Sequence, residues 1–405
     1  MNSRAKFFVV MSSTCMVALL LLGVAASKGA SAGETAQGDT NIYKHLAVYS
    51  EVLSRIKSEY VEEPDMGNVT LGALNGLLES IDPYASYLNA SQYKDYLKNF
   101  DAYRGDTGMV LAKKFGYITV ISVIPGSSAA KAGLTTGDML ESIKGIATRD
   151  MPLAYARLLL KGEPGSTIEL SVLRRKPEPQ KLTLERQVLA YPPVESRLLP
   201  DNIGYVKVET MSAGKVAEVS TAVANLQKDG AKSLILDVRN CATGTPEDGV
   251  ELANLFLDKG LITYTQGQRS PRRDFNADPK KAVTTLPLVV ATNRGTALAA
   301  EVAAAALEAN KRAGVVGERT YGDASVLRPI TMDDGSAIIL SVAKYYSPDG
   351  KSIQDNGVTP EDVVVEPEPA VPDTGDDEPV VETKETKPAE DLILKRAIEV
   401  AHDKK

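Results

Sequence analysis

The stretch LPLVVATNRGTALAAEVAAAALEANKRAGVVGERTYG, residues 286–322, decides the fold of this chain. It begins with an apolar run, continues with an alanine-rich segment of helical length at 297–310, and returns to a second apolar run, AGVVG. Two strands joined by a helix form the unit of a parallel sheet, because strands running in one direction need a crossover of about a dozen residues or more. The stretch therefore predicts an α/β layer.

The same alternation extends on both sides of this stretch. From about residue 200 to 365 the chain adds more apolar strands and two more segments with helical periodicity. The strands are IGYVKV, SLILDV and LITYT, and the helices lie at 214–228 and 247–258. Residues 191–365 are therefore predicted to form one α/β core with a mostly parallel central sheet.

Two further modules precede this core. Residues 99–190 contain short alternating strands (YITVISVI, TIELSVL, KLTLERQVL) bounded by glycine and proline turns, which predicts a β-rich module. Residues 41–98 have a helical pattern, and a second helix, LGALNGLLESI, is expected to end before Asp82-Pro83. The apolar residues of the first helix fall roughly on one face: Leu46, Val48, Val52, Leu53 and Ile56. Together the segments predict a multidomain α+β protein.

The two ends of the chain differ from the rest. In residues 1–32, Arg4 and Lys6 precede an apolar run over 7–26 and then small residues, as in an export signal. The run is close to the roughly 20 residues that span a bilayer, so both cleavage and retention as a membrane anchor stay open. Either outcome predicts a periplasmic or other extracytoplasmic protein. Residues 366–390 are rich in proline and acid and predict a disordered linker, and 391–405 predict a short, detached helix.

Composition excludes several functions. The net charge of -7 argues against a nucleic-acid partner, and the arginines of QRSPRRDF are interpreted as a solvated loop. Only two cysteines, Cys15 and Cys241, and two histidines, His45 and His402, occur. This leaves no disulfide framework and no cysteine-rich zinc site, and we expect neither a metal nor another cofactor.

The run PGSSAAKAGLTTGDMLESIKG, residues 125–145, resembles a PDZ domain. The resemblance implies that a peptide C-terminus adds as a strand beside residues 109–112. Its carboxylate would be held by backbone N–H groups of the loop Asp106, Thr107, Gly108 and Met109. Such loops often begin with glycine, and the carboxylate of Asp106 would repel a bound terminus unless it points to solvent. The alternative is that the module is only a structural lever or lid.

Four stretches extend the resemblance to a family. They are LLESIDPYASYL (77–88), LILDVRNCATGTPEDGVELANLFLDKG (234–260), residues 291–326 and AKYYSPDGKSIQDNGVTPEDVV (343–364). In order and spacing they resemble the carboxyl-terminal processing, or tail-specific, peptidases. The resemblance covers about residues 45 to 365 and implies a PDZ module on a peptidase core with crotonase-like layers.

Members of this family use a serine nucleophile and a lysine base. The serine is the middle one of a run Asn-x-Gly-Ser-Ala-Ser-Ala-Ser-Glu, whose register here is set by Asn293, Gly295, Ala297, Ala299 and Glu301. The three serine positions hold Thr296, Leu298 and Ala300, so Leu298 stands at the nucleophile position.

The other catalytic positions have changed as well. The lysine follows Gly-Glu-Arg-Thr-Tyr-Gly, which is intact at 317–322 and is followed by Asp323. Leu327 stands where a glutamine is usual, and Thr243-Gly244 replaces the Gly-Gly oxyanion turn. The resemblance therefore implies a pseudopeptidase that binds protein C-terminal tails, an active family relative or a second copy of itself.

Two alternatives remain open. An active peptidase of unusual mechanism would need Cys241, Thr296 or Ser325 as nucleophile, yet none has an adjacent base in sequence. We interpret Cys241 as a small buried residue in a turn, and Lys311 and Arg312 as pointing to solvent. A scaffold would instead use the amphipathic helix at 45–60 and the detached helix at 390–401 for dimerisation.

Overall fold

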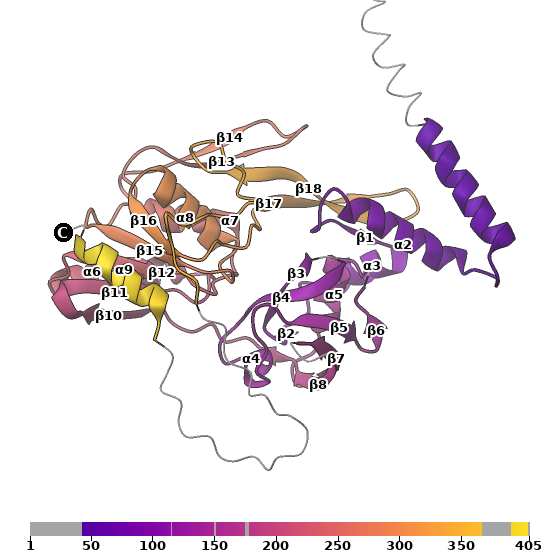
Figure 1. Cartoon of the computed structure of the whole chain (residues 1–405), viewed down its shortest axis with the longest axis horizontal. Coiled ribbons are helices and arrows are strands. Elements are labelled where there is room, and N and C mark those ends of the chain that lie inside the picture. The colour runs from indigo at the N-terminus through magenta and orange to yellow at the C-terminus, as the bar shows by residue number, and fades with distance from the viewer. Residues whose placement is uncertain (1–42, 115, 150, 175–177, 367–389, 404–405) are drawn as a thin grey trace, which may run out of the picture. The chain divides into compact units, whose positions relative to one another are not determined.

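The structure, a computed structural model, describes residues 43–114, 116–149, 151–174, 178–366 and 390–403 (Figure 1). The export segment 1–32 and nearly all of the linker, 367–389, lie outside the described residues. The chain divides into one unit that ends at Leu71 and another that begins at Gly72. Across the described ranges, no helix combines the length and the apolar character needed to cross a membrane.

The first unit is helical, as its periodicity predicts. It contains a helix over residues 43–59 and the start of α2 (Met66–Glu79). Leu46, Val48 and Val52 of the first helix are half exposed or more. The predicted amphipathic face is thus present and uncovered within this unit.

The β-rich module forms a sheet in the order β3-β4-β5-β7-β8, with β6 paired to β5. Its elements are β3 (Met109–Lys114), β4 (Tyr117–Val123), α4 (Ser128–Lys131), β5 (Met139–Ile143), β6 (Ile146–Ala147), α5 (Leu153–Leu160), β7 (Thr167–Leu173) and β8 (Gln180–Glu185). Two short strands, β2 (Gly105–Asp106) and β9 (Gln187–Val188), pair beside it. Among the described strands, β3 pairs with β4 alone, so its other edge is where an added strand would lie.

The core is built on a six-stranded sheet in the order β10-β11-β12-β15-β16-β19. The strands are β10 (Glu195–Leu199), β11 (Ile203–Lys207), β12 (Ser233–Asp237), β15 (Leu288–Thr292), β16 (Ala313–Gly317) and β19 (Asp362–Val363), with a 3₁₀ turn at Pro200–Asn202. Every pairing is parallel except that of β10 with β11. The predicted mostly parallel sheet is therefore confirmed, as is the multidomain α+β class.

Helices cover both faces of this sheet. They are α6 (Lys215–Lys228), α7 (Pro246–Asn254), α8 (Ala299–Ala309) and α9 (Leu392–Asp403). Leu234 and Leu236 of β12 pack in the core formed with α6, α7 and α8, whereas Ile235 packs in a second cluster with Ala397 and Ala401 of α9. This is the two-residue period of a strand that is buried on both sides.

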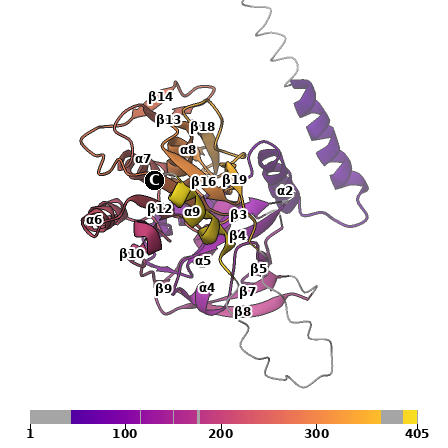
Figure 2. The same cartoon turned by 60° about the vertical axis from the view of Figure 1, so that its left-hand side comes forward.

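The prediction of a detached C-terminal helix is wrong, because α9 lies on the sheet against β12, β15 and β16 (Figure 2). The guanidinium of Arg239 fixes its start, pairing with Glu366 at 2.6 Å and with Asp391 at 2.7 Å. Without α9 the apolar residues on this face of the sheet would be exposed to water. The helix is thus part of the core and not a detached element.

A second sheet has the order β1-β18-β13-β14, with β17 paired to β18. Its strands are β1 (Ser86–Leu88), β13 (Leu261–Gln266), β14 (Arg273–Asn276), β17 (Ser325–Thr331) and β18 (Ala337–Tyr346), and α3 (Ala90–Asn99) follows β1. LITYT, predicted among the strands of the parallel sheet, lies here instead as β13. No helix separates it from β14, so the chain turns back as an antiparallel hairpin. β1 also lies within the segment 41–98 that was predicted as helical, beyond the end expected for its second helix at Asp82-Pro83.

Candidate functional site

Two loops meet at the carboxyl ends of the neighbouring strands β12 and β15. The N–H of Asn240 donates to the side-chain oxygen of Asn293 at 2.9 Å, and the amide of Asn293 donates back to the side chain of Asn240 at 3.0 Å. The N–H of Ala297 also donates to the carbonyl of Cys241 at 2.9 Å. Loops at this end of a parallel sheet commonly carry a binding or catalytic site, and these two are fastened to each other.

Leu298 lies where the second loop enters α8. Its backbone has φ 54° and ψ -121°, a conformation that strongly favours glycine and costs other residues on the order of 1–3 kcal/mol. The side chain is half-buried and packs on the cluster that also receives Leu327 and Tyr321. The position of the expected nucleophile thus keeps a strained backbone while its side chain offers only apolar contacts.

Glu301, in the first turn of α8, organises the next loop. Its carboxylate accepts hydrogen bonds from the hydroxyl of Thr320 at 2.5 Å and from the N–H groups of Gly322 and Asp323 at 2.6 and 2.8 Å. The side chain is fully buried, and burial raises the pKa of Glu301 to about 7. The intact sequence at 317–322 therefore forms the shell around the altered position rather than the site itself.

Asp323, at the position of the expected lysine, is 4% exposed. Among the described residues, none forms a hydrogen bond or an ion pair with its carboxylate. Burial raises the pKa of Asp323 to about 6, which the cation of Arg157 opposes and Asp82 reinforces. The carboxylate therefore lies near Arg157, a residue of the β-rich module, without pairing with it.

The remaining positions of the expected catalytic motif are Thr243, Gly244 and Leu327. The hydroxyl of Thr243 accepts a hydrogen bond from the N–H of Met211 at 2.7 Å. Gly244 has φ 84°, and a Cβ there would lie 2.6 Å from that of Met211. Leu327 begins the regular part of β17, after a bulge. Leu298 and Leu327 thus meet in one apolar cluster, whereas Thr243 and Gly244 shape the first loop.

The three replacement nucleophiles are held in other roles. Cys241 is fully buried, and burial raises the pKa of its thiol to about 12. The hydroxyl of Thr296 is buried and donates to the carbonyl of Val238 at 2.9 Å. Ser325 accepts a hydrogen bond from the hydroxyl of Ser341 at 3.0 Å. No described histidine, lysine or carboxylate forms a hydrogen bond with any of the three.

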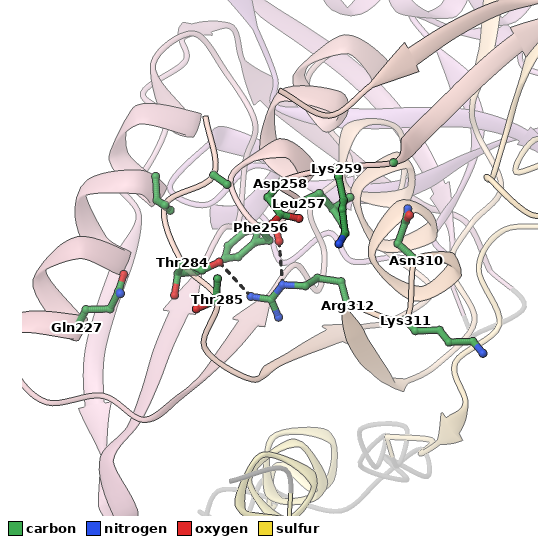
Figure 3. A pocket seen from close by; sticks show the side chains of 13 residues that line it. Gln227, Phe256, Leu257, Asp258, Lys259, Thr284, Thr285, Asn310, Lys311 and Arg312 are labelled. Atoms are coloured by element: carbon green, nitrogen blue, oxygen red, sulfur yellow. Dashed lines mark hydrogen bonds between the residues drawn. The ribbon is translucent and has the colours of Figure 1, made fainter. Parts of the chain in front are cut away.

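A cavity of about 860 Å³ lies elsewhere, between the ends of α7 and α8 (Figure 3). Arg312 was predicted to point to solvent, but it donates to the carbonyls of Phe256 and Leu286, at 2.8 Å each. It therefore supports the wall of this cavity, which is lined by none of the predicted site residues.

The loop expected to hold a peptide carboxylate has the backbone that this role requires. Gly108 has φ 86°, and a Cβ there would lie only 2.2 Å from that of Ser127. The side chain of Asp106 is half-buried, and it is directed at its own loop, where it accepts the N–H of Gly108 at 2.9 Å. Thr107 is fully buried and Met109 nearly so.

The β-rich module contacts the loops of the core. The hydroxyl of Ser122 on β4 donates to the carbonyl of Asn240. A Cβ added to Gly295 would lie 3.2 Å from the hydroxyl of Thr136. Leu298 and Leu327 pack on the same apolar cluster as the core of this module. The loops around Leu298 therefore contact the β-rich module through both apolar and polar groups.

Sequence reasoning missed Arg157 and the structural role of Glu301. Glu301 served only to set the register of a motif, yet an acid in the first turn of the alanine-rich AAEVAAAALEA, within a run of apolar residues, signals a buried partner. Arg157, on α5, donates to the carbonyl of Leu111 on β3 at 2.9 Å, and no local pattern distinguishes it from a surface arginine.

Comparison with known proteins identifies this architecture. Residues 202–365 match peptidase family S41, and residues 119–174 match a PDZ domain. The carboxy-terminal processing protease CtpA of Bacillus subtilis (strain 168) is 31% identical over 366 residues, covering 89% of this chain and 77% of that protein. A carboxy-terminal-processing protease of Bartonella bacilliformis (strain ATCC 35685 / KC583 / Herrer 020/F12,63) is 30% identical, covering 83% of this chain and 78% of that protein.

A solved structure agrees with these matches. The photosystem II D1 C-terminal processing protease superimposes with a TM-score of 0.65 at 26% identity, over 79% of this chain and 92% of that chain. The fold is thus a PDZ module joined to a family S41 peptidase core. The chain belongs to the carboxy-terminal processing protease family.

Proposed function

We propose that this chain is a pseudopeptidase that holds polypeptide tails and does not cut them by the serine–lysine mechanism. The observation that carries the proposal is Leu298 in the strained loop before α8, where a nucleophilic side chain would be presented. Serine–lysine chemistry needs a hydroxyl within hydrogen-bond reach of a neutral amine. Leu298 has no heteroatom, and Asp323 has no amine.

The surroundings of the other hydroxyl and thiol groups support the proposal. A thiol with a pKa of about 12, as at Cys241, is almost wholly protonated at neutral pH and is a poor nucleophile. Thr296 is committed to the carbonyl of Val238. A nucleophile without a positioned base is weakly activated, so neither offers a replacement dyad.

One observation favours a second candidate, hydrolysis by a water molecule. Asp323 is a buried carboxylate without a partner among the described residues, and its pKa of about 6 suits a general base near neutral pH. Such a base would need space for a water molecule and a substrate carbonyl beside it. The cavity described above is not lined by Asp323, so we rank this candidate second.

The decisive experiment measures retention and cleavage separately. The purified full-length chain, in mild detergent, is incubated with an unstructured protein that ends in apolar residues. Retention is followed by pull-down, and cleavage by intact-mass spectrometry. The Bacillus subtilis relative serves as the control for cleavage. We expect retention of the protein without any loss of its C-terminal residues.

Substitutions distinguish the alternatives if cleavage is seen. Cleavage abolished by Cys241→Ala, Thr296→Ala or Ser325→Ala would reveal a replacement nucleophile and overturn the proposal. Cleavage that survives all three but is lost in Asp323→Asn would establish the water mechanism. Absence of both retention and cleavage would leave the scaffold as the better description.

We also propose a location outside the cytoplasm, reached through residues 1–32. Support comes from Arg4 and Lys6 ahead of the apolar run over 7–26. Either release after cleavage or anchoring by that run is compatible with it, and an active relative or a second copy would then be met in the same compartment. Fractionation with N-terminal sequencing distinguishes the two, and a cytoplasmic chain with an intact N-terminus would contradict both.

A further inference from the structure

We propose that Asp106 is an internal carboxylate that occupies the peptide-terminus site of the PDZ module and sets its preference against ligands with a free C-terminal carboxylate. The proposal rests on the proposed function in one respect, because it assumes that this module binds polypeptide. It adds the chemistry of the ligand: segments recognised through strand pairing and apolar side chains rather than through a terminal charge.

The geometry at the loop carries the proposal. A terminal carboxylate is captured in such modules by successive backbone N–H groups in a tight turn. Here Oδ1 of Asp106 accepts the N–H of Gly108 at 2.9 Å. One of the N–H groups expected to hold a ligand is therefore already bonded to an anion of the chain itself.

The neighbouring cations do not draw Asp106 away from this position. Lys161 donates to the carbonyl of Phe100 at 2.7 Å and lies over its ring. Arg186 donates to backbone carbonyls, including those of Leu159 and Leu160 at 2.9 Å each. Among the described residues Asp106 makes no ion pair, so the hydrogen bond from Gly108 is its principal contact.

The adjacent edge strand is partly occupied too. Arg157 donates to the carbonyl of Leu111, while the next carbonyl, that of Ala112, accepts the hydroxyl of Thr119 on β4. Neighbouring carbonyls of a strand point in opposite directions, so that of Leu111 faces the edge where a peptide would pair. A ligand must therefore displace one internal partner at the edge and, if it ends in a carboxylate, a second at the loop.

The charge of Asp106 decides which ligands lose the most affinity. A terminal carboxylate entering the loop would meet the carboxylate of Asp106 in a buried setting, where like charges repel strongly and each requires the same N–H donors. A peptide that ends in an amide, or that binds through an internal segment, avoids this repulsion. Asp106 thus determines specificity without contacting the side chains of the ligand.

The test uses one peptide in two forms. A fluorescent peptide with apolar C-terminal residues is prepared with a free carboxylate and as the amide, and both are titrated with the full-length chain in mild detergent. For the unaltered chain we expect the carboxylate form to bind no more tightly than the amide. In Asp106→Ala the affinity for the carboxylate form should rise about tenfold or more, and the affinity for the amide form should stay unchanged.

Two further variants serve as controls. Asp106→Asn keeps an acceptor for the N–H of Gly108 but removes the charge, so an intermediate gain is expected. Asp101→Ala removes an exposed carboxylate a few residues away and should leave both affinities unchanged. Thermal unfolding of each variant verifies that the module remains folded.

A measurement without any ligand tests the internal bond directly. Amide hydrogen exchange at Gly108 should be slow in the unaltered chain and faster in Asp106→Ala, and an unchanged rate would overturn the proposal. So would a tenfold preference of the unaltered chain for the carboxylate form, which would nevertheless uphold tail binding. If no variant binds either form of the peptide, the proposed function fails and the ligand preference fails with it.

Discussion

The loop that enters α8 and the loop that enters β3 each hold a residue at positive φ. The two residues have different side chains. In the PDZ loop the residue is Gly108, at φ 86°, and no larger side chain fits against Ser127. In the loop that enters α8 the residue is Leu298, at φ 54°, and its side chain has apolar neighbours. One position is filled by the residue its backbone prefers, and the other by a residue its backbone penalises.

On the two proposals made above, the loops differ from the expected pattern in different ways. Around Leu298 the buried frame is present, while the expected serine and lysine positions hold Leu298 and Asp323. At Asp106 the backbone of the loop is present, but the carboxylate accepts the N–H of Gly108. The first kind of loss requires several substitutions to reverse, whereas the second requires one. Leu298→Ser with Asp323→Lys would still leave Leu327 and Thr243 in place.

The largest effect is expected from Glu301, because the frame around Leu298 depends on it. Glu301→Ala would leave the donors of Thr320, Gly322 and Asp323 unsatisfied in a buried site, and we expect a loss of about 4 kcal/mol in the free energy of unfolding. Urea denaturation measures it. Glu251→Ala, which removes an exposed ion pair with Lys281, should cost less than about 1 kcal/mol. Equal losses in the two variants would mean that the frame does not depend on this carboxylate.

Gly108→Ala tests the other half of the comparison. The added Cβ would lie 2.2 Å from that of Ser127, and the residue would be held at positive φ. We expect a loss of about 3 kcal/mol in the free energy of unfolding. Gly126→Ala is the matched control, since Gly126 also has positive φ but no atom within 4 Å of the added Cβ. Its loss of unfolding free energy should be only about 1 kcal/mol. An equally small loss in Gly108→Ala would show that the loop around Gly108 adjusts to the added Cβ.

The buried carboxylate of Asp323 makes the stability of the chain depend on pH. The pKa of its side chain rises from an ordinary 3.8 to about 6 on folding, chiefly through burial. Between those values the folded chain binds more protons than the unfolded one, so stability falls as pH rises and the deficit is complete above about pH 6. Asp323→Asn should therefore be more stable than the unaltered chain by about 2 to 3 kcal/mol at pH 7 and by little near pH 4.

Denaturation at a series of pH values measures the effect of Asp323. Asp229→Asn, at an exposed carboxylate, should follow the unaltered chain throughout. A constant difference between Asp323→Asn and the unaltered chain across this range would show that the carboxylate of Asp323 is well solvated.

The fold could be predicted from the sequence where it depends on local pattern. The helices and the parallel strands of the core follow from periodicity, because burial on both faces of β12 makes SLILDV continuously apolar. The error at β13 arose because a strand pattern does not identify its partner, and the hairpin to β14 depends on the turn between them. The docking of α9 depends on Arg239, whose partners are distant in sequence.

The positions of the site could be predicted from motif register, but their physical state could not. No pattern shows that Leu298 has positive φ, because hydrogen bonds from loops distant in sequence impose it. Nor does the sequence show that Asp106 bonds to its own loop, since that contact depends on where the N–H of Gly108 is directed. Register identifies which residue stands at a position, while tertiary contacts decide what that residue does there.

The smallest effect should measure the strain at Leu298 directly. Leu298→Ala and Leu298→Gly remove the same apolar contacts, but only glycine relieves the penalty of φ 54°. We therefore expect the glycine variant to be more stable than the alanine variant by about 1 kcal/mol in urea denaturation. At Ala303, in the middle of α8, the change to glycine should have the opposite sign, because glycine is a poor helix former. An alanine variant as stable as the glycine variant would mean that the loop relaxes once the leucine is gone, and that Leu298 itself maintains the strained conformation.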